Sequence, residues 1–137
     1  MKNSSDFLTH NQHNALAIVR IVTGLMMIYH GVEVFDGTKI QEYSQWDSLK
    51  STGFPMAMAY LGKGSELLIG ILFSLGLFTR FAAFLMIFTM LYITFKIGNG
   101  QFWYADQHPF MFVLVGVIYL FLGENKFSFD NYFSKKE

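Results

Sequence analysis

The sequence predicts an all-α membrane protein: a single membrane domain, 1–137, forming a bundle of four transmembrane helices with the N and C termini on the cytoplasmic side. Composition is the first reason, because 53% of the residues are hydrophobic and 15% are charged, whereas soluble domains average about 45–50% and about 25%. The second reason is that the charges leave apolar runs of the roughly 20 residues that cross a bilayer. The third is the stretch 81–95, whose only non-aromatic polar residues are threonines, so that a helix there has no face for water.

The first three spans follow from the apolar runs. Residues 15–35 contain only three charged or histidine residues, and residues 57–78 contain only two, so each stretch predicts one span. The apolar run 68–95 is too long for a single crossing. Because Gly76 lies near its middle, close to a threonine and an arginine, we expect a tight helical hairpin there and a third span over 81–97.

The fourth span, 107–123, rests on the shortest apolar run. A helix that begins before this run reaches the length of a span, and Pro109 suits a first helical turn, where its missing N–H costs nothing. Asp106 or His108 would cap that helix. The four spans leave 36–56 as an outer loop.

The distribution of basic residues predicts the orientation in the membrane. Four spans place both termini and the hairpin on one side, with five basic residues against three in the opposite loops. The five are Lys2, Arg80, Lys126, Lys135 and Lys136. The positive-inside rule therefore puts the termini in the cytoplasm, as in a multi-pass protein of the cell inner membrane, with 124–137 as an interfacial tail.

Several classes of function are excluded by composition. The chain has no cysteine, which removes disulfides, thiol nucleophiles and cysteine-ligated metals or clusters. Its net charge of zero and two arginines argue against a nucleic-acid partner, since such a protein needs a basic face. The lipid bilayer is the partner that the composition predicts.

Five ionisable residues fall in the outer half of the predicted bundle: His30, Glu33, Lys63, Glu66 and His108. An ionisable group in hydrocarbon is costly unless it is paired or faces a cavity. The pairs on the first and second helices are each spaced by three residues, so each pair shares a helix face. Two carboxylates, a lysine and two histidines are more than is needed to hold two helices together. We interpret the set as a ligand or proton site; no metal site is predicted.

A purely structural role is the alternative for the same residues. Lys63 paired with Glu33 or Glu66 would join two helices without any ligand. His30 and His108 can in principle hold a haem axially. Haem is disfavoured as a cofactor, because nothing in the sequence fixes the separation of the two histidines.

The cytoplasmic side has its own candidates for structural ion pairs: Arg20, Arg80 and Asp130. Such pairs would tie the tail to the bundle, and an Arg20 that snorkels toward the headgroups is the alternative. Small residues on the first two helices are expected to let the backbones approach closely. These are Gly24, Gly31, Gly62, Gly70 and Gly76.

Three sequence blocks carry a family resemblance. They are VRIVTGLMMIYHG at 19–31, SELLIGILFSLGLFTRFAA at 65–83 and GENKFSFD at 123–130. In this order they resemble the DoxX family of small four-helix membrane proteins, and they cover most of the chain. The resemblance carries over to Arg20, Gly24, His30, Gly31, Glu66, Gly70, Gly76, Arg80, Gly123, Ser128 and Asp130.

Two places depart from the family pattern. Relatives carry a lysine four residues after the histidine, where this chain has Val34, so any role of that lysine is in doubt, although Lys63 can place an ammonium at similar depth. The terminal block reads Gly123-Glu124-Asn125 instead of Gly-Pro-Gly. Asparagine tolerates the left-handed conformation that glycine would adopt, so the turn is expected to persist.

The resemblance implies a membrane subunit of a quinone-linked oxidoreductase, because the family takes its name from membrane subunits of a thiosulfate:quinone oxidoreductase. The outer cluster would bind a quinone and exchange its protons. Without a cysteine, a dinucleotide fingerprint or a metal set, the chain would depend on a membrane or extracytoplasmic redox partner protein for electrons. The alternatives are a non-enzymatic membrane scaffold or assembly factor, and a small proton-coupled carrier, for which the lack of an inverted repeat calls for a homo-oligomer.

Overall fold

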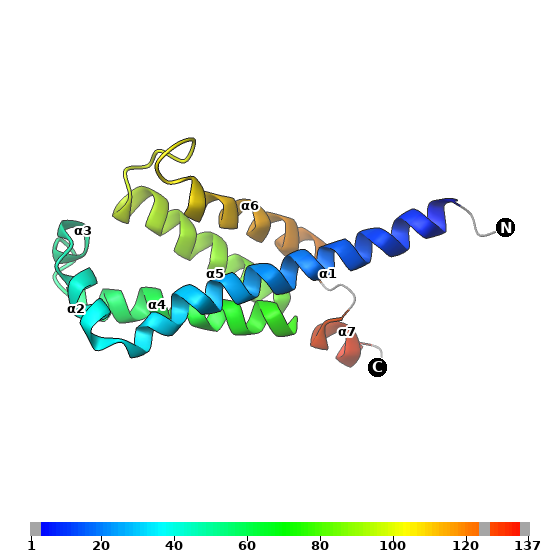
Figure 1. Ribbon diagram of the computed structural model, residues 1–137, viewed down its shortest axis with the longest axis horizontal. Coiled ribbons are helices and arrows are strands. Elements are labelled where there is room, and N and C mark those ends of the chain that lie inside the picture. Colours follow the sequence, from blue (N-terminus) through cyan, green and yellow to red (C-terminus); the bar gives the residue numbers. More distant parts are fainter. Residues whose placement is uncertain (1–3, 124–126, 135–137) are drawn as a thin grey trace.

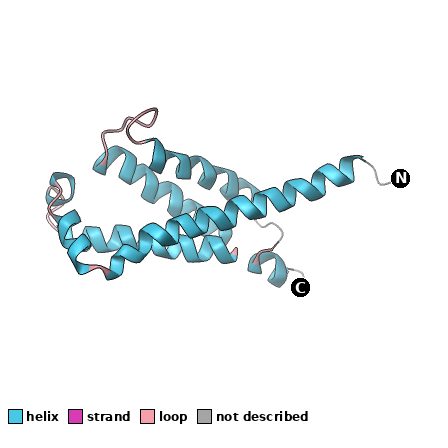
Figure 2. Ribbon diagram, viewed as in Figure 1, coloured by secondary structure: helices cyan, strands magenta, loops and turns pink. Residues whose placement is uncertain are grey.

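The computed structural model describes residues 4–123 and 127–134, with side chains from residue 11 onward. Within these residues the regular secondary structure is helical, without a strand (Figures 1 and 2). The α-helices are α1 (Ser4–Gly31), α2 (Gly37–Ser44), α3 (Asp47–Lys50), α4 (Pro55–Leu75), α5 (Thr79–Tyr92), α6 (Gln107–Leu122) and α7 (Phe129–Ser134). A 3-10 helix, η1 (Val32–Phe35), follows α1, and a π-helical turn, η2 (Ile93–Ile97), follows α5. The prediction of an all-helical protein is confirmed.

Four long helices run along the molecule, with α4 packed against α1 and α6 against α5. The N-terminal end of α1, the α4–α5 turn and α7 lie toward one end of the bundle, and α2, α3 and the η2–α6 connection lie toward the other (Figure 1). Three stretches are long and apolar enough to cross a membrane: Asn11–Phe35, Pro55–Leu75 and Thr79–Ile97. The shorter α6 is also apolar, so three to four helices are compatible with a membrane bundle.

The predicted hairpin between the second and third helices is confirmed. Gly76 adopts a left-handed conformation with φ of +64°, which glycine reaches without a steric penalty. Its N–H donates to the carbonyl of Phe73, and that of Leu77 donates to the carbonyl of Leu72 at 2.9 Å. This pair of bonds is the Schellman ending of a helix, and α5 begins at Thr79.

Three local features differ from the expectations. The first helix begins at Ser4, well before residue 15, because a polar stretch can extend a helix beyond hydrocarbon. The segment 36–56 contains α2 and α3, whose apolar side chains Ile40 and Leu49 are buried against Ala59. Asp106 is the N-cap residue of α6, but its carboxylate makes no bond to that helix.

The carboxylate of Asp106 instead closes the preceding turn. It accepts hydrogen bonds from the backbone N–H groups of Asn99 at 3.0 Å and Gln101 at 2.9 Å. His108 lies inside the first turn of α6 and is not the cap. Residues 124–126 and 135–137, which include Asn125 and the basic residues Lys126, Lys135 and Lys136, lie outside the described residues, as does Lys2.

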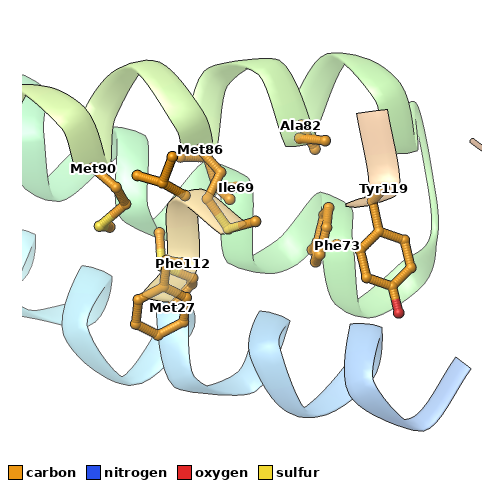
Figure 3. Packing of buried hydrophobic residues seen from close by; sticks show 10 residues of the cluster. Met27, Ile69, Phe73, Ala82, Met86, Met90, Phe112 and Tyr119 are labelled. Carbon is orange, nitrogen blue, oxygen red and sulfur yellow. The ribbon is translucent and has the colours of Figure 1, made fainter. Parts of the chain in front are cut away.

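All four long helices contribute to one hydrophobic core. Figure 3 shows Met27 of α1 beside Phe112 of α6, and Phe73 of α4 beside Tyr119 of α6. The rings of Phe73 and Tyr119 meet edge to face with centroids 5.1 Å apart. The Tyr119 hydroxyl donates to the backbone carbonyl of Leu16 in α1, so the polar end of this buried ring is satisfied.

The close approach of α1 and α4 depends on three glycines. A Cβ added at Gly24, Gly31 or Gly70 would collide with backbone atoms of the opposite helix, which confirms the predicted packing role. The same prediction is wrong for Gly62, because a Cβ there would meet no atom within 4 Å. Gly62 therefore borders open space instead of a neighbouring helix.

Candidate functional site

The carboxylate of Glu33 is the centre of a polar network at the end of the bundle where α2 and α3 lie. One of its oxygens accepts from the Tyr43 hydroxyl at 2.6 Å and from the Lys63 ammonium at 2.9 Å. Its other oxygen accepts from Lys39. Lys63 also binds the carboxylate of Glu66 at 3.0 Å, so one ammonium bridges two carboxylates.

Three different elements position this network. Lys63 and Glu66 are three residues apart on α4 and therefore share a face, while Glu33 lies in η1, directly after α1. Tyr43 comes from α2, whose first turn is held by Asp36 through hydrogen bonds from the backbone N–H groups of Thr38 and Lys39 at 3.0 and 3.2 Å. The short helix α2 thus closes over charges that η1 and α4 bring together.

The network is largely shielded from solvent. The side chains of Glu33, Lys63 and Glu66 are 19%, 17% and 8% exposed. Outside the spans, burial and the hydrogen bond to Glu33 raise the pKa of Tyr43 above its usual value. The hydrogen bond to Glu33 also raises the pKa of Lys39. Both donors are therefore held in their protonated forms at neutral pH.

A pocket of about 170 Å³ lies against this network. Its polar wall is formed by Tyr43, Trp46, Lys63 and Glu66. The remaining lining is apolar and comes from α3, α4 and η2: Leu49, Met58, Ala59, Gly62, Ile93 and Ile97. A small cavity with an ammonium and a carboxylate on one wall can bind a polar headgroup and exchange a proton with it.

The two histidines occupy a neighbouring position between α1 and α6. The rings of His30 and His108 meet edge to face with centroids 5.4 Å apart, and His108 also contacts Phe112. Among the described residues, neither histidine donates to or accepts from the Glu33 network. The predicted five-residue set therefore forms two adjacent groups, and a porphyrin would have to separate two rings that are already in contact.

At the end of the bundle where α7 lies, Arg20 and Asp130 bind backbone groups. The Arg20 guanidinium, which is fully buried, donates to the carbonyls of Phe73 at 2.5 Å and Phe127 at 2.6 Å. The Asp130 carboxylate accepts from the N–H groups at the start of α5 and from the Thr79 hydroxyl, each at 2.8 Å. Arg20 and Asp130 thus tie the tail segment to the α4–α5 turn.

Arg80 occupies a separate place at this end of the molecule. Its side chain is exposed, and its guanidinium lies against Gly123, where an added Cβ would meet it. Gly123 has φ of +67°, a conformation that favours glycine.

Several residues at the pocket were not predicted from the sequence. Tyr43 and Trp46 lie in the segment 36–56 that the sequence predicts as a loop; Tyr43 belongs to α2, whereas Trp46 precedes α3 in extended conformation, and their rings meet with centroids 4.9 Å apart. Ile93 and Ile97 belong to a π-helical turn, a rare geometry that frequently occurs at functional sites. The residues that the structure describes contain no group of three potential metal ligands.

Comparison with protein families confirms the resemblance over the first two sequence blocks. The model of the DoxX family matches residues 15–99. The chain is 33% identical over 96 residues to a Bacillus subtilis (strain 168) protein named "Putative oxidoreductase CatD", covering 64% of this chain and 67% of the relative.

A second relative spans nearly the whole sequence. It is a Haemophilus influenzae protein named "Uncharacterized protein", 31% identical over 128 residues that cover 88% of this chain and 92% of the relative. No solved structure shows a significant match. The match to the family model and the apolar helices lead to one conclusion: the chain belongs to the DoxX family of membrane proteins.

Proposed function

We propose that this protein is a membrane subunit of a quinone-linked oxidoreductase system of the thiosulfate:quinone type, and that its outer pocket binds the quinone headgroup. The observation that carries the proposal is the pocket lined by Lys63 and Glu66, where a charged wall faces an apolar one. A quinone has the same two-sided character, with polar carbonyls on an apolar ring. The similarity to a protein named as an oxidoreductase supports the reaction class.

The chemistry assigns roles to the residues of the pocket. A quinone becomes a quinol by taking up two electrons and two protons. Lys63 has three N–H donors, of which two bind Glu33 and Glu66, so the third can donate to a quinone carbonyl. Glu66 lines the pocket and would exchange a proton with the reduced ring.

The electrons would come from a partner. The chain has no cysteine, and a redox partner protein in the membrane or on its outer face would oxidise a reduced sulfur compound as the two-electron donor. His30 and His108, in contact beside the network, would serve as a second proton-exchanging pair. Because neither histidine lines the pocket, this pair would exchange protons outside it.

The same proposal specifies the topology. We infer a single membrane domain of four spans in the cell inner membrane, with the termini, Arg20, Arg80 and Asp130 on the cytoplasmic side and the pocket toward the outside. At about 1.5 Å per residue, the sixteen residues of α6 are shorter than a hydrocarbon core of about 30 Å. The fourth span would therefore include part of its flanking segments or local thinning of the bilayer. In a homo-oligomer, a second copy of the chain would instead pack against α6 and shield it.

The direct test is purification from native-like membranes in mild detergent, followed by extraction and mass spectrometry of bound lipids. The wild type is expected to retain a quinone in near-stoichiometric amount, and folded Glu66→Gln is expected to lose it. Glu42→Gln, which removes an exposed carboxylate on α2, is the matched control and should retain the quinone.

An empty wild type would contradict the proposal. If Glu66→Gln then lowered only the stability, the network would be the structural core of a membrane scaffold or assembly factor. Proton-coupled uptake of a solute by reconstituted wild type, without bound quinone, would instead favour a small carrier.

A further inference from the structure

A second cavity adjoins the headgroup pocket. It has a volume of about 330 Å³ and lies between α4 and α5, with Leu49 of α3 at its outer end. Five residues line both cavities: Leu49, Met58, Gly62, Ile93 and Ile97. The two spaces are therefore neighbours that share one wall.

This second cavity, which we name the lipid groove, differs in character from the pocket. Apart from Gly62, Ser65, Thr89 and Tyr92, its lining is aliphatic or phenylalanine. Leu61 and Phe88 at its margin are 64% and 65% exposed. These side chains form an open, apolar margin on two helices that are long and apolar enough to cross a membrane. In the bilayer of the proposed function, the groove would therefore open sideways into the hydrocarbon.

Gly62 is the small residue at the boundary between the two cavities. A Cβ at this position would meet no atom within 4 Å, so the glycine is not needed for helix packing. Glycine inside a helix is less favourable than alanine, so packing and helix propensity give no reason for it here. Gly62 lines both cavities, so the open space beside it borders the charged pocket as well as the lipid groove.

We infer that the ligand of this site carries a long apolar chain, that the chain passes Gly62 into the lipid groove, and that Gly62 thereby selects for chain-bearing ligands. This inference rests on the proposed function, because the headgroup occupies the pocket beside Lys63 and Glu66. The two spaces match the two parts of one amphipathic molecule: charged groups for the head and a groove open to lipid for the tail. A water-soluble ligand has no use for the second cavity.

The test compares two ligands that differ only in the chain: a tail-free dimethoxy-methyl-benzoquinone and its decyl analogue. Apparent Kd values come from the ligand-induced rise in the unfolding midpoint of the purified protein in one detergent. The proteins are the wild type, Gly62→Leu and Gly64→Leu. Gly64 is the matched control, because it lies on the same helix and its added Cβ also meets open space.

The deciding quantity is the preference for the decyl compound, expressed as the ratio of the two Kd values. Partition into micelles affects all three proteins equally and cancels in the comparison. Because a leucine side chain at this position would fill space that both cavities share, we expect the preference to fall by about tenfold or more in Gly62→Leu. The preference of Gly64→Leu should equal that of the wild type.

An unchanged preference in Gly62→Leu, or an equal loss of both ligands, would overturn the inference. If neither quinone raises the midpoint of the wild type, the proposed function itself fails, which is a different result. Gly62→Ala provides a milder variant, for which the same loss of preference is expected at smaller size. Its unfolding midpoint without ligand shows whether the helix tolerates the change.

Discussion

Lys63 lies between two carboxylates in the least exposed part of the polar network. Its ammonium is 2.9 Å from Glu33 and 3.0 Å from Glu66, and it also lies 5.1 Å from the centroid of the Tyr43 ring. Its removal would leave two shielded carboxylates without their common partner. Glu33 keeps its ion pair with Lys39, but the 8% exposed side chain of Glu66 loses its cation, and an uncompensated shielded charge is among the most destabilising consequences of a single substitution.

We expect Lys63→Met to lower the free energy of unfolding by about 3 kcal/mol. Lys39 binds the same carboxylate, but its side chain is 47% exposed, so Lys39→Met should lower it by less than about 1 kcal/mol. Denaturant unfolding of both variants in one detergent measures the difference. Equal losses would show that shielding of the network has no energetic consequence.

Tyr43 gives the network a dependence on alkaline pH. Burial and the hydrogen bond to Glu33 raise its pKa above the usual value of 10.0, so the folded state binds this proton more tightly than the unfolded state. The resulting stabilisation is complete below a pH of about 10 and is lost as the pH rises toward the folded-state pKa. Tyr43→Phe removes both the proton and the hydrogen bond.

The difference in unfolding free energy between the wild type and Tyr43→Phe should be about 1–3 kcal/mol at neutral pH. It should shrink above a pH of about 10. A pH series of thermal unfolding measurements on the two proteins gives this difference directly. A difference that grows with rising pH would contradict the assignment of the hydrogen bond.

The packing of α1 on α4 depends on where glycine occurs along the helix. A Cβ at Gly70 would lie 2.6 Å from the backbone nitrogen of Ile28, whereas one at Gly62 would meet open space. Gly70→Ala should therefore lower the free energy of unfolding by about 1–3 kcal/mol. Gly62→Ala should leave it unchanged or raise it by up to about 1 kcal/mol. The same loss for both alanine variants in thermal unfolding would argue against this helix interface.

The long helices could be predicted because hydrocarbon demands continuous apolar runs, and charges between these runs mark the ends. The short helices α2 and α3 could not, because Ile40 and Leu49 are isolated apolar residues in a polar segment. Elements of eight and four residues are too short for a helical period to appear. The π-helical turn at the end of α5 depends on tertiary contacts and has no local sequence signal.

The residues that gather at this end of the bundle could be predicted from the sequence, but their grouping could not. The spacing of three residues predicts that His30 and Glu33 share one helix face. The chain changes from α1 to η1 at Val32, however, which turns Glu33 toward Lys63 while His30 meets His108. The change from an α-helix to a 3-10 helix between His30 and Glu33 therefore places them in two different groups.

The topology of the whole molecule can be tested with cysteines, since the chain has none. Gln101, in the η2–α6 connection, and Ser134, at the end of α7, are both exposed. We expect Gln101→Cys to react with a membrane-impermeant maleimide in intact cells. Ser134→Cys should react only after the membrane is permeabilised. The reverse pattern would place the pocket on the cytoplasmic side and contradict the proposed orientation.

The tryptophans allow binding at the pocket to be observed directly, because the chain has two. Trp46 lines the pocket, whereas Trp103 lies in the η2–α6 connection. Trp103→Phe therefore leaves one fluorophore at the proposed site, and Trp46→Phe leaves one outside it. A quinone quenches indole fluorescence when it lies close to the ring.

Titration of these two proteins with the decyl quinone is the most direct test of a quinone site beside Lys63 and Glu66. We predict saturable quenching of Trp46 that is lost when Glu66→Gln is added to the still-folded Trp103→Phe protein. Trp103 should show only the weak, non-saturating quenching of a ligand dissolved in the micelle. Equal, non-saturating quenching of both tryptophans, unaffected by Glu66→Gln, would contradict the central claim that this pocket binds a quinone.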